Sequence, residues 1–247
     1  MANTLARPAV DQGLVDRWIY VAMAALFLAT AVVGFGPRSV EILTGVRRNP
    51  PLVVHIHAAL IVAWLGMLLT QTTLVAIGKT AWHKALGLAS LVLGPAIVAA
   101  MVAVSIWRFD ERVSLGQITA GANTLLNQGR AILYFSVFFL WAILSRKADC
   151  ETHKRMMILT IVPATTAAFA RMSWLPITTP DSPLAPHAYM LLLLTPMIIY
   201  DVVRLGRPHS AYLIGLALML PWMIATQLLW NSPWWVATAS RLMGASI

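Results

Sequence analysis

The sequence has one cysteine and few charged residues, and both shortages limit what the chain can be. Cys150 is the only cysteine among 247 residues, so the chain can form neither an internal disulfide nor a cluster of thiolate metal ligands. Any metal or cofactor must then be held by nitrogen or oxygen atoms. Only 11% of the residues are charged, while 59% are hydrophobic and the mean hydropathy is +0.75. Soluble domains do not have this balance, so the composition predicts a polytopic membrane protein.

Other features that are missing exclude particular classes of protein. The stretch MANTLARPAVDQGLVDR carries two aspartates and no apolar core, so we expect no cleaved signal peptide. The sequence contains no HExxH motif, which counts against a typical zinc hydrolase. The last apolar run has no lysine, which disfavours a retinal Schiff base. Positively charged loops and anionic lipid account for the net charge of +9, so we expect no nucleic-acid partner.

Seven apolar runs are each long enough to cross a hydrocarbon core as a helix of about 20 residues. The runs are continuously apolar rather than alternating, which indicates helices and not the strands of a barrel. We therefore predict an all-α protein, a bundle of seven transmembrane helices that forms one domain over residues 1–247. The expected spans are 18–36, 52–78, 85–107, 124–145, 156–175, 187–205 and 211–230.

The distribution of lysine and arginine predicts the orientation of this bundle. If the helices alternate in direction, more basic residues fall on the side of the N-terminus than on the other side. We therefore expect the N-terminus inside, in a bacterial inner (cytoplasmic) membrane, with the lipid bilayer as the main partner. Trp234 and Trp235, near the end of the chain, are expected to anchor it at the lipid headgroups.

The span at 52–78 carries polar side chains at membrane depth. Such groups are costly in lipid and are therefore candidates for function. His57, Trp64 and Gln71 are spaced by seven residues, which places them within about 40° of one another on a helix. His55 lies two residues from His57 and so about 200° away. We take His57, Trp64 and Gln71 as the inward face, with the opposite rotation, His55 inward, as the alternative.

The span at 124–145 predicts a second polar face. The residues at helical spacing are Asn123, Asn127, Arg130, Tyr134 and Trp141. We expect Arg130 roughly 9 Å below the start of this helix. Arg171 is expected near the outer end of the next span, which Pro163 should bend. A buried guanidinium needs a carboxylate or a phosphate. The acid nearest to a span is Asp201, which we expect to pair with Arg204 at i, i+3.

The six histidines divide between the two membrane edges. His55, His57 and His187 are expected toward the outer edge, and the inner group contains His83, His153 and His209. A b-type haem takes one neutral imidazole from each of two facing helices, so two such groups are the arrangement that a transmembrane electron carrier needs.

The sequence predicts how these histidines pair. His83 and His153 form the inner pair, since each begins a helix on the same side, and the lysines that follow them, Lys84 and Lys154, meet the haem propionates. His57 and His187 form the outer pair. Arg130 or Arg171 is then the propionate partner on that side.

Three motifs carry a resemblance to other proteins. HIHAAL with Gln71 beyond it, then WHKALG, then THKRMMIL followed by Arg171, resembles a group of uncharacterised bacterial multi-spanning proteins with similarly placed histidines. The overall plan is distantly similar to the two-haem membrane cytochromes of the cytochrome b561 type. This resemblance covers Leu52 to Trp174 and implies that His57, His83 and His153 are ligands. Haem cores of that type use a histidine on each of four successive helices, whereas the fourth helix here has Arg130 and no histidine.

Three functions remain open on the sequence alone. The first is a b-type haem protein, a membrane oxidoreductase, that moves electrons to or from quinone or a redox protein. The second is a metal-dependent intramembrane enzyme that holds zinc, copper or iron through His55, His57, His83 and His153. The third is a non-enzymatic assembly or transport protein in which Arg130 and Arg171 bind an anionic ligand. All these side chains also have ordinary roles at membrane boundaries, by snorkelling or hydrogen bonding.

Overall fold

A computed structural model describes residues 12–176 and 182–245, and every regular element in them is helical. The predicted all-α class is therefore confirmed. The N-terminal stretch expected to lack a signal peptide lies mostly in residues 1–11, outside the described residues. The helices are α1 (Gln12–Leu43), α2 (Leu52–Ala76), α3 (Thr80–Gly87), α4 (Ser90–Ser114), α5 (Ile118–Ser145), α6 (Cys150–Ile161), the 3₁₀ helix η1 (Val162–Ala164), α7 (Thr165–Phe169), α8 (Leu184–Leu192), α9 (Thr195–Leu205), α10 (Ser210–Leu229) and α11 (Pro233–Met243).

Six helical segments in the described residues are long and apolar enough to cross a membrane: Gly13–Leu43, Leu52–Ala76, Ser90–Ser114, Ile118–Ser145, Leu184–Leu205 and Ser210–Leu229. Large apolar side chains such as Val62, Val92 and Leu140 are exposed along them, as expected for surfaces that face lipid. The chain is therefore a multi-pass membrane protein. The expected span at 156–175 is not among the six.

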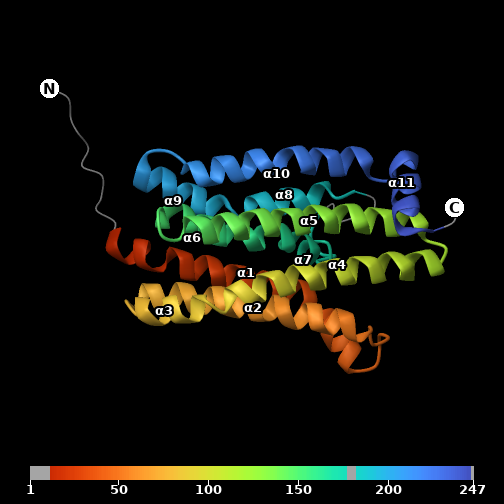
Figure 1. The fold of residues 1–247 in the computed structure, drawn as a ribbon, viewed down its shortest axis with the longest axis horizontal. Helices are drawn as coiled ribbons and strands as arrows, with labels where there is room; N and C mark the ends of the chain where they lie inside the picture. Colours follow the sequence, from red (N-terminus) through yellow and green to blue (C-terminus); the bar gives the residue numbers. More distant parts are fainter. Residues whose placement is uncertain (1–11, 177–181, 246–247) are drawn as a thin grey trace.

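The long helices run alternately up and down along one axis (Figure 1), which gives the bundle two ends. The α3 end holds α3, the start of α1 and the start of α6. The α11 end holds α11, the end of α1 and the start of α5. At the α3 end the side chain of Arg17 in α1 donates a hydrogen bond to the carbonyl of Ala76 at the end of α2, so these two helices are tied together there.

Several helices extend beyond the apolar runs that predicted them. α1 continues through Pro37 to Leu43, although we expected a loop from residue 37. α5 begins at Ile118, before the expected start at 124. The reason is that hydropathy marks the part of a helix that lies in lipid, whereas hydrogen bonding continues past it. A proline costs a helix one hydrogen bond but does not always end it.

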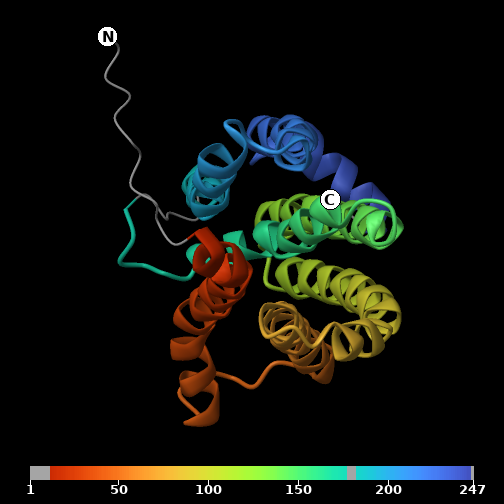
Figure 2. The ribbon, with the colours of Figure 1, turned by 90° about the vertical axis from the view of Figure 1, so that its left-hand side faces the viewer.

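The expected fifth span is a broken helical segment at the centre of the bundle. α6 ends at Ile161, η1 contains Pro163, and α7 is a separate short helix (Figure 2). The break falls where Pro163 predicts a bend, because proline has no N–H to donate to the preceding turn. The hydroxyl of Thr165 donates to the carbonyl of Val162 at 2.6 Å, and that of Thr166 to the carbonyl of Pro163 at 2.9 Å. Both hydroxyls are thus hydrogen-bonded to carbonyls within the broken segment itself. Such irregular backbone is tolerated at membrane depth only inside protein.

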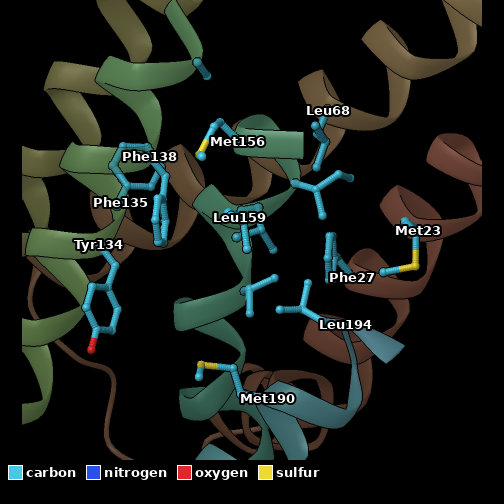
Figure 3. Close-up of a cluster of buried hydrophobic side chains, with 14 of the residues drawn as sticks. Met23, Phe27, Leu68, Tyr134, Phe135, Phe138, Met156, Leu159, Met190 and Leu194 are labelled. Carbon is cyan, nitrogen blue, oxygen red and sulfur yellow. The ribbon is translucent and has the colours of Figure 1, made fainter. Parts of the chain in front are cut away.

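The main core forms around this central segment. Met156 and Leu159 of α6 lie between Phe138 of α5 and Phe27 of α1 (Figure 3), and all four are almost completely buried. The segment is thus surrounded by protein rather than by lipid. This explains why it can carry threonine, arginine and histidine without the continuous apolar run of a lipid-facing helix.

The last helix lies across the α11 end of the bundle (Figure 1). The side chain of Ser232 caps its first turn by accepting from the N–H of Trp235 at 3.2 Å. The indole N–H of Trp235 donates to the carbonyl of Ala122 in α5 at 2.8 Å. Trp235 is therefore half-buried and bonded to protein, whereas Trp234 is exposed, and a position of these two residues at the headgroups stays a prediction.

Candidate functional site

The α3 end holds His83 and His153, the histidines predicted to form the inner pair. In the first turns of α6, Nδ1 of His153 lies 2.7 Å from the carbonyl oxygen of Ala142 in α5. A carbonyl oxygen only accepts hydrogen bonds, so Nδ1 carries the proton and Nε2 has the free lone pair. His83 of α3 is half-buried, and its buried Nδ1 has no hydrogen-bond partner among the described residues.

Electrostatics connects these two imidazoles. Burial is the main cause that lowers the pKa of His83 below the ordinary value of histidine, and Lys84 lowers it further, while a backbone hydrogen bond to Gln71 opposes the shift. His153 lies within electrostatic reach of His83 and of Arg146. The neutral imidazole is the form that binds a metal ion.

The lysines beside these histidines differ in what they can do. Lys84 is exposed in the last turn of α3. Lys154 is directed elsewhere, with its Nζ 2.7 Å from a carboxylate oxygen of Glu151 and 5.0 Å from the ring centroid of Tyr20. Lys154 is thus already paired, and the cation that acts on His153 is Arg146, which the sequence did not single out. Arg146 follows the end of α5, and its position depends on a contact between helices that no local motif reveals.

The two histidines of α2 face different surroundings. His55 is exposed, and its Nε2 lies 2.8 Å from Oδ1 of Asn49. His57 is half-buried, and its buried Nδ1 has no partner among the described residues. Further along the same face Trp64 and Gln71 are buried. This is the rotation that the spacing of seven favours, while a ligand role for His57 stays a prediction.

The four predicted metal ligands do not meet. His55 and His57 lie near the start of α2, at the opposite end of the bundle from His83 and His153. Within the described residues no three His, Cys, Asp or Glu side chains form a group that could hold a metal ion. At the α3 end the described residues therefore offer two imidazoles as ligands, and not the three or more ligands of a metal site.

The predicted outer pair is not brought together either. α2, which carries His57, packs against α1 and α4, whereas α8, which carries His187, packs against α7 and η1. His187 is buried and lies instead within electrostatic reach of Arg130. The predicted outer pair of histidines is therefore absent from the described residues, and the residue within electrostatic reach of His187 is Arg130.

Arg130 lies in the middle of the bundle. It is 3% exposed, and its Nη2 donates to Oδ1 of Asn127 at 2.8 Å and to the hydroxyl of Thr166 at 3.1 Å. Because α5 begins at Ile118, Arg130 is roughly 18 Å along this helix and not the expected 9 Å. Asn127, predicted as an inward polar residue, is half-buried and holds the guanidinium.

Arg171 lies close to the end of the broken segment that replaces the predicted fifth span. It is exposed in the turn after α7, where its guanidinium carbon lies 4.4 Å from the ring centroid of Phe35 and its Nη1 donates to the carbonyl of Ala167. Arg130 and Arg171 are thus held by neighbouring residues of α7, Thr166 and Ala167, but they do not share a partner.

A buried ion pair that the sequence did not predict joins α6 to α9. Arg155 is 2% exposed and Asp201 is completely buried, and Nε of Arg155 donates to Oδ2 of Asp201 at 3.0 Å. The same carboxylate oxygen accepts from the backbone N–H of His209 at 3.1 Å. The expected pair of Asp201 with Arg204 is wrong, because Arg204 is on the exposed face of α9 and pairs with Asp16 of α1.

Comparison with known proteins adds no assignment to this geometry. The sequence matches no protein-family model and no curated protein, and the fold matches no solved structure. Function must therefore be argued from the side chains themselves.

Proposed function

We propose that this chain is a membrane electron carrier that binds one b-type haem between His83 of α3 and His153 of α6. A single observation carries the proposal: two imidazoles from different helices lie within electrostatic reach at one end of the bundle. A haem with two histidine ligands uses such a pair, and it supplies one-electron transfer when it is bound.

The tautomer of His153 supports its role as a haem ligand. Ligand histidines commonly donate their other ring N–H to a backbone carbonyl, which fixes the tautomer and makes the free nitrogen more basic. The bond from Nδ1 of His153 to the carbonyl oxygen of Ala142, at 2.7 Å, has this form. His83 contributes a buried Nδ1 without a partner among the described residues, which is an atom that a ligand would satisfy.

The charges around the pair also suit a haem. Lys84 acts on His83 and Arg146 acts on His153, and positive charge of this kind favours the carboxylates of haem propionates. It disfavours a bare divalent cation, so haem fits better than zinc or copper. No residue of α3 is fully buried, so a planar ligand beside His83 displaces no packed core.

The proposal includes a topology. The segment from Cys150 to Phe169 is the seventh crossing, between α5 and α8, and the N-terminus lies inside a bacterial inner membrane. The α3 end is then the cytoplasmic end. Quinone or a redox protein is the partner that gives electrons to this end or takes them from it.

The experiment is an absorption spectrum of the purified, dithionite-reduced protein. We expect the sharp bands of a b-type haem, and we expect His83→Ala and His153→Ala each to remove them completely. The double variant should lose no more than either single variant, because the two residues act as one unit. His55→Ala is the matched control and should keep the bands, since its exposed ring binds only Asn49.

Full haem content in both single variants would contradict the proposal. So would a wild-type protein, expressed with haem available, that shows no absorption beyond its aromatic residues. In either case the two histidines have only a structural role at the boundary of the membrane.

A further inference from the structure

Arg130 is a cation at the depth where charge is most costly. It lies roughly 18 Å along a helix of 28 residues, near the middle of the crossing, and only 3% of it is exposed. Taking an ammonium or guanidinium ion out of water costs several kcal/mol in real proteins unless other groups compensate for it. The groups around Arg130 therefore decide whether it has a purely structural role.

The partners of Arg130 are neutral, and they use only one of its three nitrogen atoms. Asn127 and Thr166 both accept from Nη2, and the guanidinium carbon lies 5.5 Å from the ring centroid of Tyr134. Nε and Nη1 are buried and have no hydrogen-bond partner among the described residues. One N–H on Nε and two on Nη1 thus remain available, held in place by the two bonds of Nη2.

Arg155 shows how this chain satisfies a buried guanidinium when the role is structural. Its Nε and Nη2 bind the carboxylate of Asp201, and its Nη1 binds the carbonyl oxygen and the carboxylate of Glu151. All three nitrogen atoms have partners, and two of these partners are anions. Arg130, equally buried, has no ion pair in the described part of the chain.

A second buried side chain with an unsatisfied polar atom lies within electrostatic reach of Arg130. His187, in the first turn of α8, is 3% exposed, and its Nε2 is buried without a hydrogen-bond partner in the described residues. Arg130 and His187 are within electrostatic reach of each other. Two helices far apart in sequence thus each carry buried polar atoms without a hydrogen-bond partner in the described residues, which is uncommon unless a further group binds them.

Positive charge continues from this region toward the α11 end. Thr166, which binds Arg130, precedes Ala167, whose carbonyl accepts from Arg171. Arg38 and Arg108 add their charge around Arg171, and the charge of Arg108 is partly offset by its pair with Glu111. An anion that approaches this part of the bundle is therefore attracted before it reaches Arg130.

We infer that Arg130, Asn127, Thr166 and His187 form an intramembrane binding site for a ligand that carries a single carboxylate. The site has one uncompensated positive charge, so one negative charge neutralises it. A phosphate dianion would leave a second charge without a partner in a medium of low dielectric constant. The carboxylate belongs either to a water-soluble organic acid or to a fatty acid from the bilayer. Neither case depends on the haem proposed at the other end.

The test uses the full chain purified in detergent, with thermal unfolding followed by tryptophan fluorescence at pH 7 and constant ionic strength. The probes are acetate, benzoate, oleate and inorganic phosphate, with chloride as the reference salt. We expect at least one carboxylate to raise the melting temperature in a saturable way, since a ligand that binds only the folded state stabilises it. A response to acetate or benzoate identifies a soluble source, and a response to oleate alone identifies the bilayer.

The variants separate a binding site from a structural arginine. Arg130→Gln should abolish the response and should also raise the melting temperature of the ligand-free protein, because it removes a buried charge without a counter-ion. Arg130→Lys keeps the charge but loses the fork of N–H donors, so its affinity should fall at least tenfold. Arg241→Gln, on the exposed face of α11, is the matched control and should respond like the wild type.

Three outcomes would overturn the inference. The wild type responds to none of the carboxylates; it responds to phosphate alone; or Arg130→Gln keeps the carboxylate response. A lower ligand-free melting temperature in Arg130→Gln would show in addition that the arginine stabilises the fold by itself.

Discussion

Arg155 contributes to the fold through charges that are taken out of water together. Its pair with Asp201 is buried on both sides and receives a further hydrogen bond from the backbone N–H of His209. Burying an ion pair costs desolvation, so its net effect on stability is modest. Leaving one of the two charges alone in the interior is much more costly.

This asymmetry gives a prediction at the residue scale. Asp201→Asn, which leaves Arg155 without its main anion, should lower the free energy of unfolding by roughly 3–5 kcal/mol. Arg155→Met should have an effect of similar size, and the double variant Arg155→Met, Asp201→Leu should cost clearly less than the sum of the single variants. Chemical unfolding in detergent measures all three.

The control lies at the same end of the bundle. Arg204→Gln breaks the partly exposed pair with Asp16 and should change stability by about 0–1 kcal/mol. Equal losses for the buried pair and the partly exposed pair would mean that Asp201 is compensated by something other than Arg155.

The same residues show what a sequence can predict about charges. The polar face of α5 follows from helical spacing, so Arg130, Asn127 and Tyr134 could be placed together from the sequence. The partner of Asp201 could not be predicted, because the i, i+3 rule offers Arg204 and says nothing about which of the two faces the core. Asp201 is completely buried and Arg204 is exposed, so a residue 46 positions away is the true partner. Such pairing depends on the packing of helices and not on local spacing.

At the scale of elements, the first turn of α6 decides where His153 lies. Asp149 is the N-cap of this helix, and its carboxylate accepts from the N–H of Thr152 at 3.0 Å. Hydrogen bonds from Thr152 also lower the pKa of Asp149 below the ordinary value. An N-cap satisfies a donor that the helix itself leaves free.

We therefore expect Asp149→Ala to lower the melting temperature and to increase amide hydrogen exchange in the first turn of α6. Asp149→Asn, which keeps an acceptor, should have a smaller effect. The pH dependence has a definite sign. A carboxyl group whose pKa is lower in the folded state than in the unfolded state stabilises the fold at pH values above its ordinary pKa of about 3.9. This stabilisation is lost as the pH falls through the pKa of the folded state.

In Asp149→Ala this part of the acid sensitivity should disappear. Melting temperatures measured between pH 3 and pH 7 for the wild type and the variant provide the comparison. If the difference in melting temperature between the two proteins stays the same from pH 3 to pH 7, the cap acts without its charge.

The sequence predicts a helix well where contact with lipid determines its residues. It predicts a helix less well where contact with other helices determines them. The spans that became α2, α4 and α10 follow from continuous apolar runs. The segment from Cys150 to Phe169 was expected as an ordinary span, and only its bend at Pro163 was visible in the sequence. Hydropathy measures how well a segment suits lipid, so it cannot recognise a segment that other helices surround on all sides.

At the scale of the whole molecule, the orientation in the membrane can be tested with the single cysteine. Cys150 is exposed at the start of α6, at the α3 end. If the N-terminus lies inside, Cys150 is cytoplasmic and should resist a membrane-impermeant thiol reagent in intact cells but react after lysis. Rapid labelling in intact cells would reverse the orientation and place the proposed haem site on the outer side. A Cys150→Ser variant controls for other labelled proteins.

The central segment also has a consequence for how the chain is made. Its first turns carry Glu151, His153, Lys154 and Arg155, a set of residues that a translocon would not readily release into lipid. Glu151 pairs with Arg155 within α6, but its carboxylate is half exposed. The buried anion that pairs with Arg155, Asp201, lies in α9, which leaves the ribosome later than α6 does. We therefore expect the nascent chain to keep α6 near the translocon, or at the membrane surface, until Asp201 has been synthesised. The order in which the helices enter the membrane would then depend on the carboxylate of Asp201 and less on the hydropathy of each helix in turn.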